Sequence, residues 1–282
     1  MLYNRQFSIA VGPPGQEGIG FTDLRVTFNI VRTSDPSANE LKVQVYNAAR
    51  ATRSKFENTD NRIILQAGYF LTGMKMLAVG DINKASTVIE PPTVVTTIEA
   101  KDGGRALREA RASVSYKAGV SVKSILDAFV EKLEVDGVEI TADLTGTFRH
   151  GWSYVGPVTD GISKLAARFG FQWSIQNNTI QITERRQPTQ REAVMLSPST
   201  GMIGSPAKVD DVRKNLKGDK EQPGVEVKCL LNPALVPGDP VVIESAEYPR
   251  ATYRIFKATH AGDTHGTQWE TKIEVVESGA AA

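Results

Sequence analysis

Two histidines and a carboxylate near the end of the sequence come closest to a recognisable chemical site. His260, Asp263 and His265 lie within one short stretch, and two imidazoles with a carboxylate can hold zinc or iron while leaving coordination positions open. The same stretch separates two strand-like runs and contains the glycines that a hairpin loop uses. We therefore predict that residues 260–268 form a connecting loop without metal, and that Trp269 anchors the next strand through its large apolar ring.

The single cysteine excludes an intrachain disulfide and a cysteine-cluster zinc site. Cys229 lies in the apolar run of residues 225–231, where Val227 and Leu231 share its face of a strand with period two. A thiolate at this place would be poorly solvated. We therefore predict a buried, unreactive thiol with a raised pKa.

Phosphate-binding and glycoside-cleaving sites lack the residue patterns that they require. The sequence has no G-x-x-x-x-G-K-[ST] loop, and the glycine-rich residues 12–20 lead into a strand pattern rather than a helix. A glycoside hydrolase needs two positioned carboxylates, but no spacing singles out a pair among Glu99, Asp102, Glu134 and Asp136, and we expect these acids to be solvated. The sequence predicts no catalytic, cofactor-binding or metal-binding residue and no enzymatic activity.

A run of basic residues and the tryptophans are two further candidates for binding surfaces. Lys101, Arg105, Arg108 and Arg111 are interleaved with acids and not with the aromatic residues of a groove for single-stranded nucleic acid. This run is predicted to be a solvated or inter-subunit face. Trp173 alternates with polar neighbours in a strand pattern, so a place in the core is expected for it.

Charge and composition narrow the class of protein further. The 282 residues include 33 Lys and Arg against 32 Asp and Glu, which gives a net charge of +1. A protein held mainly by nucleic-acid phosphates would be strongly basic, so we expect no sequence readout of nucleic acid. No apolar run approaches the ~20 residues of a membrane span, and the start lacks the pattern of a Sec signal, so no membrane insertion is expected.

The periodicity of apolar residues changes twice along the chain. Residues 21–30 and 41–45 alternate as two antiparallel strands, and a short helix over 48–56 precedes more strands up to about residue 100. Helical spacing then follows Ser121 as N-cap, and a second helix from Thr159 or Asp160 ends at Gly170. A hairpin with a Gln-Asn-Asn turn comes next, and short strands return from about residue 193.

This order predicts a mainly β protein with an α/β middle domain. Two β-barrel or sandwich domains flank a small α+β unit. The predicted domains are residues 1–104, 105–188 and 189–282.

Several strand-and-turn phrases, taken together and in order, resemble the central baseplate hub proteins of contractile-tailed bacteriophages, of the late-control protein D type. The resemblance covers nearly the whole chain. The phrases are residues 41–47, 65–69, 200–206, 224–233, 237–239, and 260–263 leading to Trp269.

The resemblance implies a structural baseplate hub in the virion tail, assembled in the cytoplasm of the host bacterium. Both terminal domains would be tube-like β domains, so that a homotrimeric ring has a pseudo-sixfold face toward the hexameric tail tube and a threefold face toward the central spike. The expected partners are tail tube proteins, the spike protein and other baseplate proteins. Strand phrases with few charges, such as residues 94–98, suit the edges that meet in such a ring.

Two other function classes stay open at this stage. A carbohydrate-binding or cell-wall-degrading tail enzyme would need carboxylates or aromatic rings converging in a cleft. A hub of a related contractile apparatus, such as a tailocin or a type VI secretion system, would have the same sequence features as a phage hub.

Overall fold

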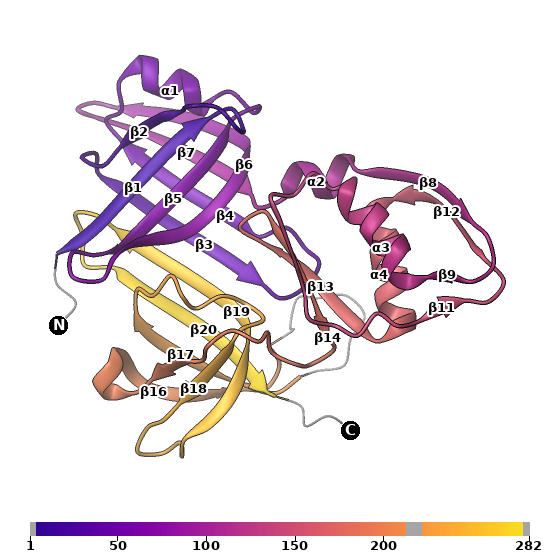
Figure 1. Ribbon diagram of the computed structural model, residues 1–282. Helices are drawn as coiled ribbons and strands as arrows, with labels where there is room; N and C mark the ends of the chain where they lie inside the picture. The colour runs from indigo at the N-terminus through magenta and orange to yellow at the C-terminus, as the bar shows by residue number, and fades with distance from the viewer. Residues whose placement is uncertain (1–3, 213–221, 279–282) are drawn as a thin grey trace.

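The computed structural model describes residues 4–212 and 222–278 (Figure 1). It is mainly β with a small α/β part in the middle, which confirms the predicted fold class. Two β units lie side by side, and the α/β unit projects from them. We call residues 5–101 the first β unit, residues 104–184 the α/β unit and residues 194–277 the second β unit.

The first β unit folds because its strands alternate buried apolar and exposed residues, as in Val26, Phe28 and Ile30 of β3. Its core gathers the apolar faces of all the longer strands and Phe56 of the short helix. Each long strand pairs antiparallel with its neighbours. The elements are β1 (Arg5–Gly12), β2 (Ile19–Phe21), β3 (Val26–Thr33), β4 (Glu40–Tyr46), α1 (Arg50–Phe56), β5 (Arg62–Tyr69), β6 (Gly73–Glu90) and β7 (Thr93–Lys101).

The α/β unit has its own apolar core between two helices and a small sheet. Ser121 caps the first helix through its side chain, and the second helix ends at Gly170, which has the left-handed conformation (φ 79°) that glycine adopts without strain. Both features confirm the sequence prediction. The elements are α2 (Gly104–Glu109), β8 (Arg111–Tyr116), β9 (Val120–Ser121), α3 (Val122–Glu131), β10 (Gly137–Ile140), β11 (Thr147–Phe148), β12 (Trp152–Pro157), α4 (Val158–Phe169), β13 (Phe171–Gln176) and β14 (Thr179–Glu184).

The second β unit contains a third apolar core, to which Cys229 belongs. Its long strand, β19, pairs with a neighbour on each side. The elements are β15 (Val194–Leu196), the 3-10 helix η1 (Pro198–Thr200), β16 (Met202–Val209), β17 (Gly224–Leu230), β18 (Pro240–Ile243), β19 (Ala251–Asp263) and β20 (Trp269–Glu277). The three cores suit the predicted domains, but the boundaries after residues 104 and 188 stay predictions.

The two β units repeat one arrangement of strands. The pairing order is β3-β4-β7-β6-β5 in the first unit and β16-β17-β20-β19-β18 in the second. The chain passes through these five strands in the same order in both units, so β3 to β7 correspond one by one to β16 to β20. All of these pairings are antiparallel.

The repeat extends to the register of single residues. Strand β6 has a bulge between Ile82 and Lys84, and β19 has one between Ile255 and Lys257. The sequences at these places agree, with Ile-Asn-Lys-Ala at residues 82–85 and Ile-Phe-Lys-Ala at 255–258. The partner strands also agree, with Thr-Thr-Ile-Glu at 96–99 and Thr-Lys-Ile-Glu at 271–274. Two copies of one β unit therefore flank the α/β unit.

Two strand predictions were wrong at their boundaries. The expected strand over residues 21–30 is broken, because β2 ends at Phe21 and β3 begins at Val26; Leu24 in the bend still packs on the core, which kept the apolar pattern going. The loop expected over residues 260–268 is shorter, because β19 pairs with β3 as far as Asp263.

The expected edge strand over residues 94–98 was also wrong. These residues belong to β7, which pairs with β4 on one side and β6 on the other. The low charge of this segment reflects its central place in the sheet. Edges that are open in the described structure lie elsewhere.

Candidate functional site

The two β units meet through a continuous sheet. Strand β3 of the first unit pairs antiparallel with β19 of the second, from Thr33 opposite Lys257 to Thr27 opposite Asp263. Figure 1 shows the two strands next to each other at this junction. A shared sheet fixes the angle and the offset between the units more firmly than a side-chain contact would, since its backbone hydrogen bonds are directional.

Side chains reinforce the end of the β3–β19 junction. Arg25 Nη2 lies 2.8 Å from Asp263 Oδ2, and the hydrogen bond from Arg25 holds the pKa of Asp263 below its usual value. Trp269 packs edge-on against Phe28, with ring centroids 5.4 Å apart, and belongs to the core of the first unit although β20 is part of the second. A Cβ at Gly262 would collide with the Phe28 ring, so this close contact requires glycine.

A buried polar network fastens the α/β unit to the first β unit. The hairpin turn between β13 and β14 has Asn177 and Asn178 at positive φ, as the sequence predicts. The carboxylate of Asp102 accepts hydrogen bonds from both backbone N–H groups, at 2.6 and 2.7 Å. Asn39 donates to Asp102 and to the last two residues of β13, through the carbonyl of Ile175 and the side chain of Gln176.

Arg32 supplies the positive charge of this network although it is only 1% exposed. Its Nε donates to Gln176 Oε1 at 3.1 Å and its Nη1 donates to the carbonyl of Leu77 at 3.2 Å. Burial holds the pKa of Asp102 above its usual value, and the charge of Arg32 and the turn N–H groups offset only part of this rise. Because the turn of the α/β unit, Asp102 and Arg32 depend on one another, the junction is a single unit of stability.

A second polar junction fastens the α/β unit to the second β unit. Arg191 lies between Glu139 on β10 and Asp239 beside β18, at 2.6 and 3.3 Å. The hydroxyl of Thr189 donates to the other oxygen of Asp239. The α/β unit is thus tied to both β units and sets their mutual orientation together with the β3–β19 pairing.

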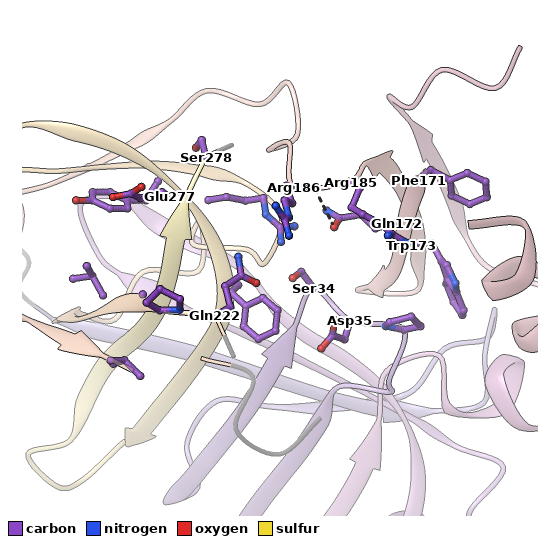
Figure 2. Close-up of a pocket in the computed structure, with 18 of the residues that line it drawn as sticks. Ser34, Asp35, Phe171, Gln172, Trp173, Arg185, Arg186, Gln222, Glu277 and Ser278 are labelled. Atoms are coloured by element: carbon purple, nitrogen blue, oxygen red, sulfur yellow. Dashed lines mark hydrogen bonds between the residues drawn. The ribbon is translucent and has the colours of Figure 1, made fainter. Parts of the chain in front are cut away.

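A large cleft opens where the three units meet (Figure 2). It has a volume of about 1450 Å³ among the described residues. Its lining mixes charges of both signs, such as Arg185, Asp35 and Glu277, and the backbone N–H of Arg186 donates to the side chain of Gln172 at 3.5 Å. Trp173 borders it but is 2% exposed, with its indole N–H donating to a serine hydroxyl. The mixed polar lining suits contact with another protein surface.

Among the ten strands of the repeat, β6 and β16 have edges that lack a strand partner within the described ranges. Strand β6 pairs with β5 only up to Asp81, so its second half, to Glu90, has a partner on the β7 side alone. Strand β16 ends the sheet and pairs only with β17. Val88 and Ile89 on the open half of β6 are 55% and 61% exposed. Open edges with exposed apolar side chains mark surfaces on which a further strand can pair.

The three possible metal ligands suggested by the sequence, His260, Asp263 and His265, are not brought together in the structure. His260 is fully buried and shares a hydrogen bond of 2.9 Å with Thr271, whereas His265 is exposed on the loop beside Thr264. No cluster of three or more possible metal ligands occurs in the described part of the chain. Burial lowers the pKa of His260 to about 3, and the charge of Arg32 adds to this.

The predicted burial of Cys229, Trp173 and Trp269 is confirmed, while the low reactivity of the thiol stays a prediction. Cys229 is 1% exposed between Val227 and Leu231 on the buried face, and burial raises its pKa to about 12. Trp269 and Trp173 are both buried. None of the described helices is long and apolar enough to cross a bilayer.

The expectation for the acids was wrong at Asp102, which is 2% exposed. Asp136 is exposed and pairs with Arg62 at 3.2 Å. In the basic run, Arg105 and Arg108 reach back to the first β unit, where they donate to the carbonyl of Asp60 and the side chain of Asn83. The run therefore helps to seat helix α2.

A match to a protein-family model shows which family the chain belongs to. The family model for "Baseplate hub gp41" matches residues 16–258, which is most of the chain. This chain belongs to the baseplate hub gp41 family. The resemblance in the sequence is thereby confirmed, and the baseplate hub is a structural part of the bacteriophage tail.

Solved structures share the fold of this baseplate hub chain at low sequence identity. A tail protein from Neisseria meningitidis MC58 matches with a TM-score of 0.71 and 9% identity, and the match covers 98% of both chains. The 43 kDa tail protein of prophage MuSo2 from Shewanella oneidensis matches with 0.70 and 10%, again over 98% of both. The E. coli c3393 protein matches with 0.63 and 10%, over 95% of this chain and 77% of that one. No curated protein sequence matches this chain.

Proposed function

We propose that three copies of this chain form the ring that joins the hexameric tail tube to the trimeric central spike. The tandem repeat of the β unit carries this proposal. Three chains with two similar units each present six similar units to a sixfold partner, while the ring itself keeps the threefold symmetry of a spike. The predicted domains at 1–104, 105–188 and 189–282 are then two tube-like units and one connecting unit.

The α/β unit has a mechanical part in this proposal. Its two polar junctions and the β3–β19 pairing hold the two β units at one fixed offset. A fixed offset within each chain is what lets three chains close into a ring instead of growing as an open filament. No enzymatic activity and no cofactor are part of this function.

The descriptions of the similar solved structures support the proposal. The E. coli c3393 protein is described as a component of the type VI secretion system with structural similarity to tail proteins gp27 and gp5 of bacteriophage T4. A VgrG complex with PdpA, from Francisella, matches with a TM-score of 0.63 and 7% identity over 99% of this chain and 59% of that one. We propose that this chain likewise associates with spike and baseplate components and is assembled into the tail inside the host cell.

Light scattering of the purified chain, alone and mixed with its tube and spike proteins, tests the proposal. The expected mass of the ring is three times the 30.6 kDa of one chain. A monomer or twofold dimer in the assembled particle would contradict the ring. Turnover of purified host cell wall that is abolished by a single carboxylate substitution would favour the enzyme alternative instead.

A further inference from the structure

The repeat assigns an occupant to the open edges of β6 and β16. In the second β unit, β19 pairs with β18 up to Arg254, and from Lys257 onward its outer side is covered by β3. In the first unit, the corresponding strand β6 pairs with β5 up to Asp81, and from Lys84 onward its outer side has no strand beside it in the described structure. The uncovered half of β6 corresponds to the half of β19 that β3 covers.

The corresponding covering strand is β16. Strand β3 is the counterpart of β16, because both are the first strand of the hairpin that ends each four-strand row, β6-β7-β4-β3 and β19-β20-β17-β16. Within one chain the β3 edge is occupied by β19, and no strand among residues 4–212 and 222–278 covers the outer edge of β16. Each chain therefore contains one complete junction, between β3 and β19. In the described residues it also presents two edges, on β6 and on β16, from which a second junction of the same kind can form.

We infer that β16 of one copy pairs antiparallel with the open half of β6 in the next copy, with residues 207–209 opposite residues 86–88, which repeats the β3–β19 junction between chains. This inference rests on the proposed ring, and names the strands and the register that close it. The contact is heterologous, since two different edges meet, and it closes only if the rotation per chain returns to the start.

The printed registers fix which residues face each other. In the chain, Asn29 of β3 lies opposite Ala261 of β19. Counted from the bulge that both units share, Ala261 on β19 corresponds to Val88 on β6. When the paired residues are followed across the next strands of each unit, Asn29 on β3 corresponds to Ala207 on β16. Val88 is therefore expected opposite Ala207 of the neighbouring copy.

The neighbouring positions along the same two strands follow. Thr87 lies opposite Lys208 and Ser86 opposite Val209, because an antiparallel register changes by one residue on each strand.

The chemistry of the two edges agrees with this register. Val88 is 55% exposed and would meet the apolar Ala207, itself exposed in the single chain. Exposed apolar side chains on an unpaired edge are a liability for a free protein, and a strand from a second copy removes it.

Paired cysteines test the register in the full chain. Opposite residues of antiparallel strands lie within the Cα distances of a disulfide, and close and wide pairs alternate. We therefore propose two double variants, Val88→Cys with Ala207→Cys and Thr87→Cys with Lys208→Cys, one of which has the closer spacing. Oxidation of the isolated protein, or of its mixture with tube and spike proteins, should give covalent species of two and three copies in at least one of them.

Two controls separate the register from chance collisions. Val88→Cys with Lys208→Cys is out of register by one residue, which points the two side chains to opposite faces, and it should give at least tenfold less product. A mixture of the single variants Val88→Cys and Ala207→Cys should stop at two copies, because each chain then has one engineered cysteine. The natural Cys229 is buried and stays in all variants.

The outcomes distinguish this inference from the proposed function. A trimeric mass without a disulfide in either in-register variant, or with equal product from the out-of-register control, would overturn the strand pairing and leave the ring intact. A protein that stays monomeric even with its tube and spike proteins would overturn both.

Discussion

The two β units share five strands in the same order, yet one corresponding position is buried in the second unit and open in the first. His260 on β19 corresponds to Thr87 on β6, and each shares a hydrogen bond with the corresponding threonine of the next strand, Thr271 and Thr96, at 2.9 and 3.0 Å. His260 is fully buried, with Ile30 of β3 opposite it, whereas Thr87 is half-buried.

This difference shows what a neighbouring strand does to an otherwise identical site. Strand β3 excludes water from the outer half of β19, so an imidazole there is held neutral beside Arg32. Strand β6 has Thr87 at this position, and its small hydroxyl can stay hydrated before assembly. The first unit is therefore built with one edge ready for a partner, and the second unit shows how that edge looks once it is covered.

The largest expected effect comes from cutting the apolar link between the units. Trp269→Ala should lower the free energy of unfolding by about 3–5 kcal/mol, as large-to-small changes in a core do. Trp269 is 3% exposed and fills the core of the first unit from a strand of the second. Urea unfolding followed by circular dichroism measures the loss; as a control, Leu71→Ala, at a side chain that is 69% exposed, should change it by less than about 0.5 kcal/mol.

Breaking the polar link to the α/β unit should cost somewhat less. Asp102→Asn keeps the volume but removes the charge beside Arg32 and one of the oxygens that accept from the turn N–H groups, so a loss of about 3 kcal/mol is expected. The matched control is Asp127→Asn, which breaks the exposed pair with Lys123 and should cost under about 0.5 kcal/mol. Equal losses in the two variants would show that the buried network adds no stability.

Acid should weaken the second unit through His260 before it affects the first. The unfolded histidine takes up a proton below about pH 6.5, while the folded one stays neutral until about pH 3. The free energy of unfolding therefore falls as the pH drops through this window, by about 2 kcal/mol between pH 7.5 and pH 5. His260→Thr, which copies the residue of the first unit, should remove this part of the pH dependence. An unchanged slope would contradict the assignment.

The smallest effect is expected at the surface end of the β3–β19 junction. Asp263→Asn removes the ion pair with Arg25, whose side chain is 46% exposed, so about 0.5 kcal/mol is expected. Because the pKa of Asp263 is lowered, its contribution is present above its unfolded pKa and is lost as the pH falls through the folded value. The wild type and the variant should thus have equal stability in strong acid, and a difference that persists there would point to packing.

Local patterns in the sequence were enough to predict the elements but not the contacts between them. Ser121, Gly170 and the Asn177–Asn178 turn have local chemical reasons for their roles, and each was predicted. The burial of Cys229 and Trp269 followed from strand period and side-chain size. The burial of Asp102 did not, because its partners Asn39 and the hairpin turn are 63 and 75 residues away along the chain.

The sequence contains the repeated segments, but two similar β domains were expected only from the resemblance to hub proteins and not from these segments. Only short phrases agree, Ile-x-Lys-Ala and Thr-x-Ile-Glu, separated by more than 170 residues and by the α/β unit. Strands with period two resemble one another in any β protein, so such phrases gain meaning only when the bulge and the register agree too. The same limit explains why residues 94–98 were taken for an edge, since a sequence does not show which neighbours a strand has.

Hydrogen–deuterium exchange, resolved to single residues, compares the two corresponding strand halves before and after assembly. In the single chain, the outward amides of residues 84–90 should exchange rapidly while those of residues 257–263 are protected by β3. In the assembled ring both sets should be protected alike, and β16 should gain protection together with β6. Trimeric particles in which residues 84–90 exchange as fast as in the single chain would contradict the account that the repeat closes the ring.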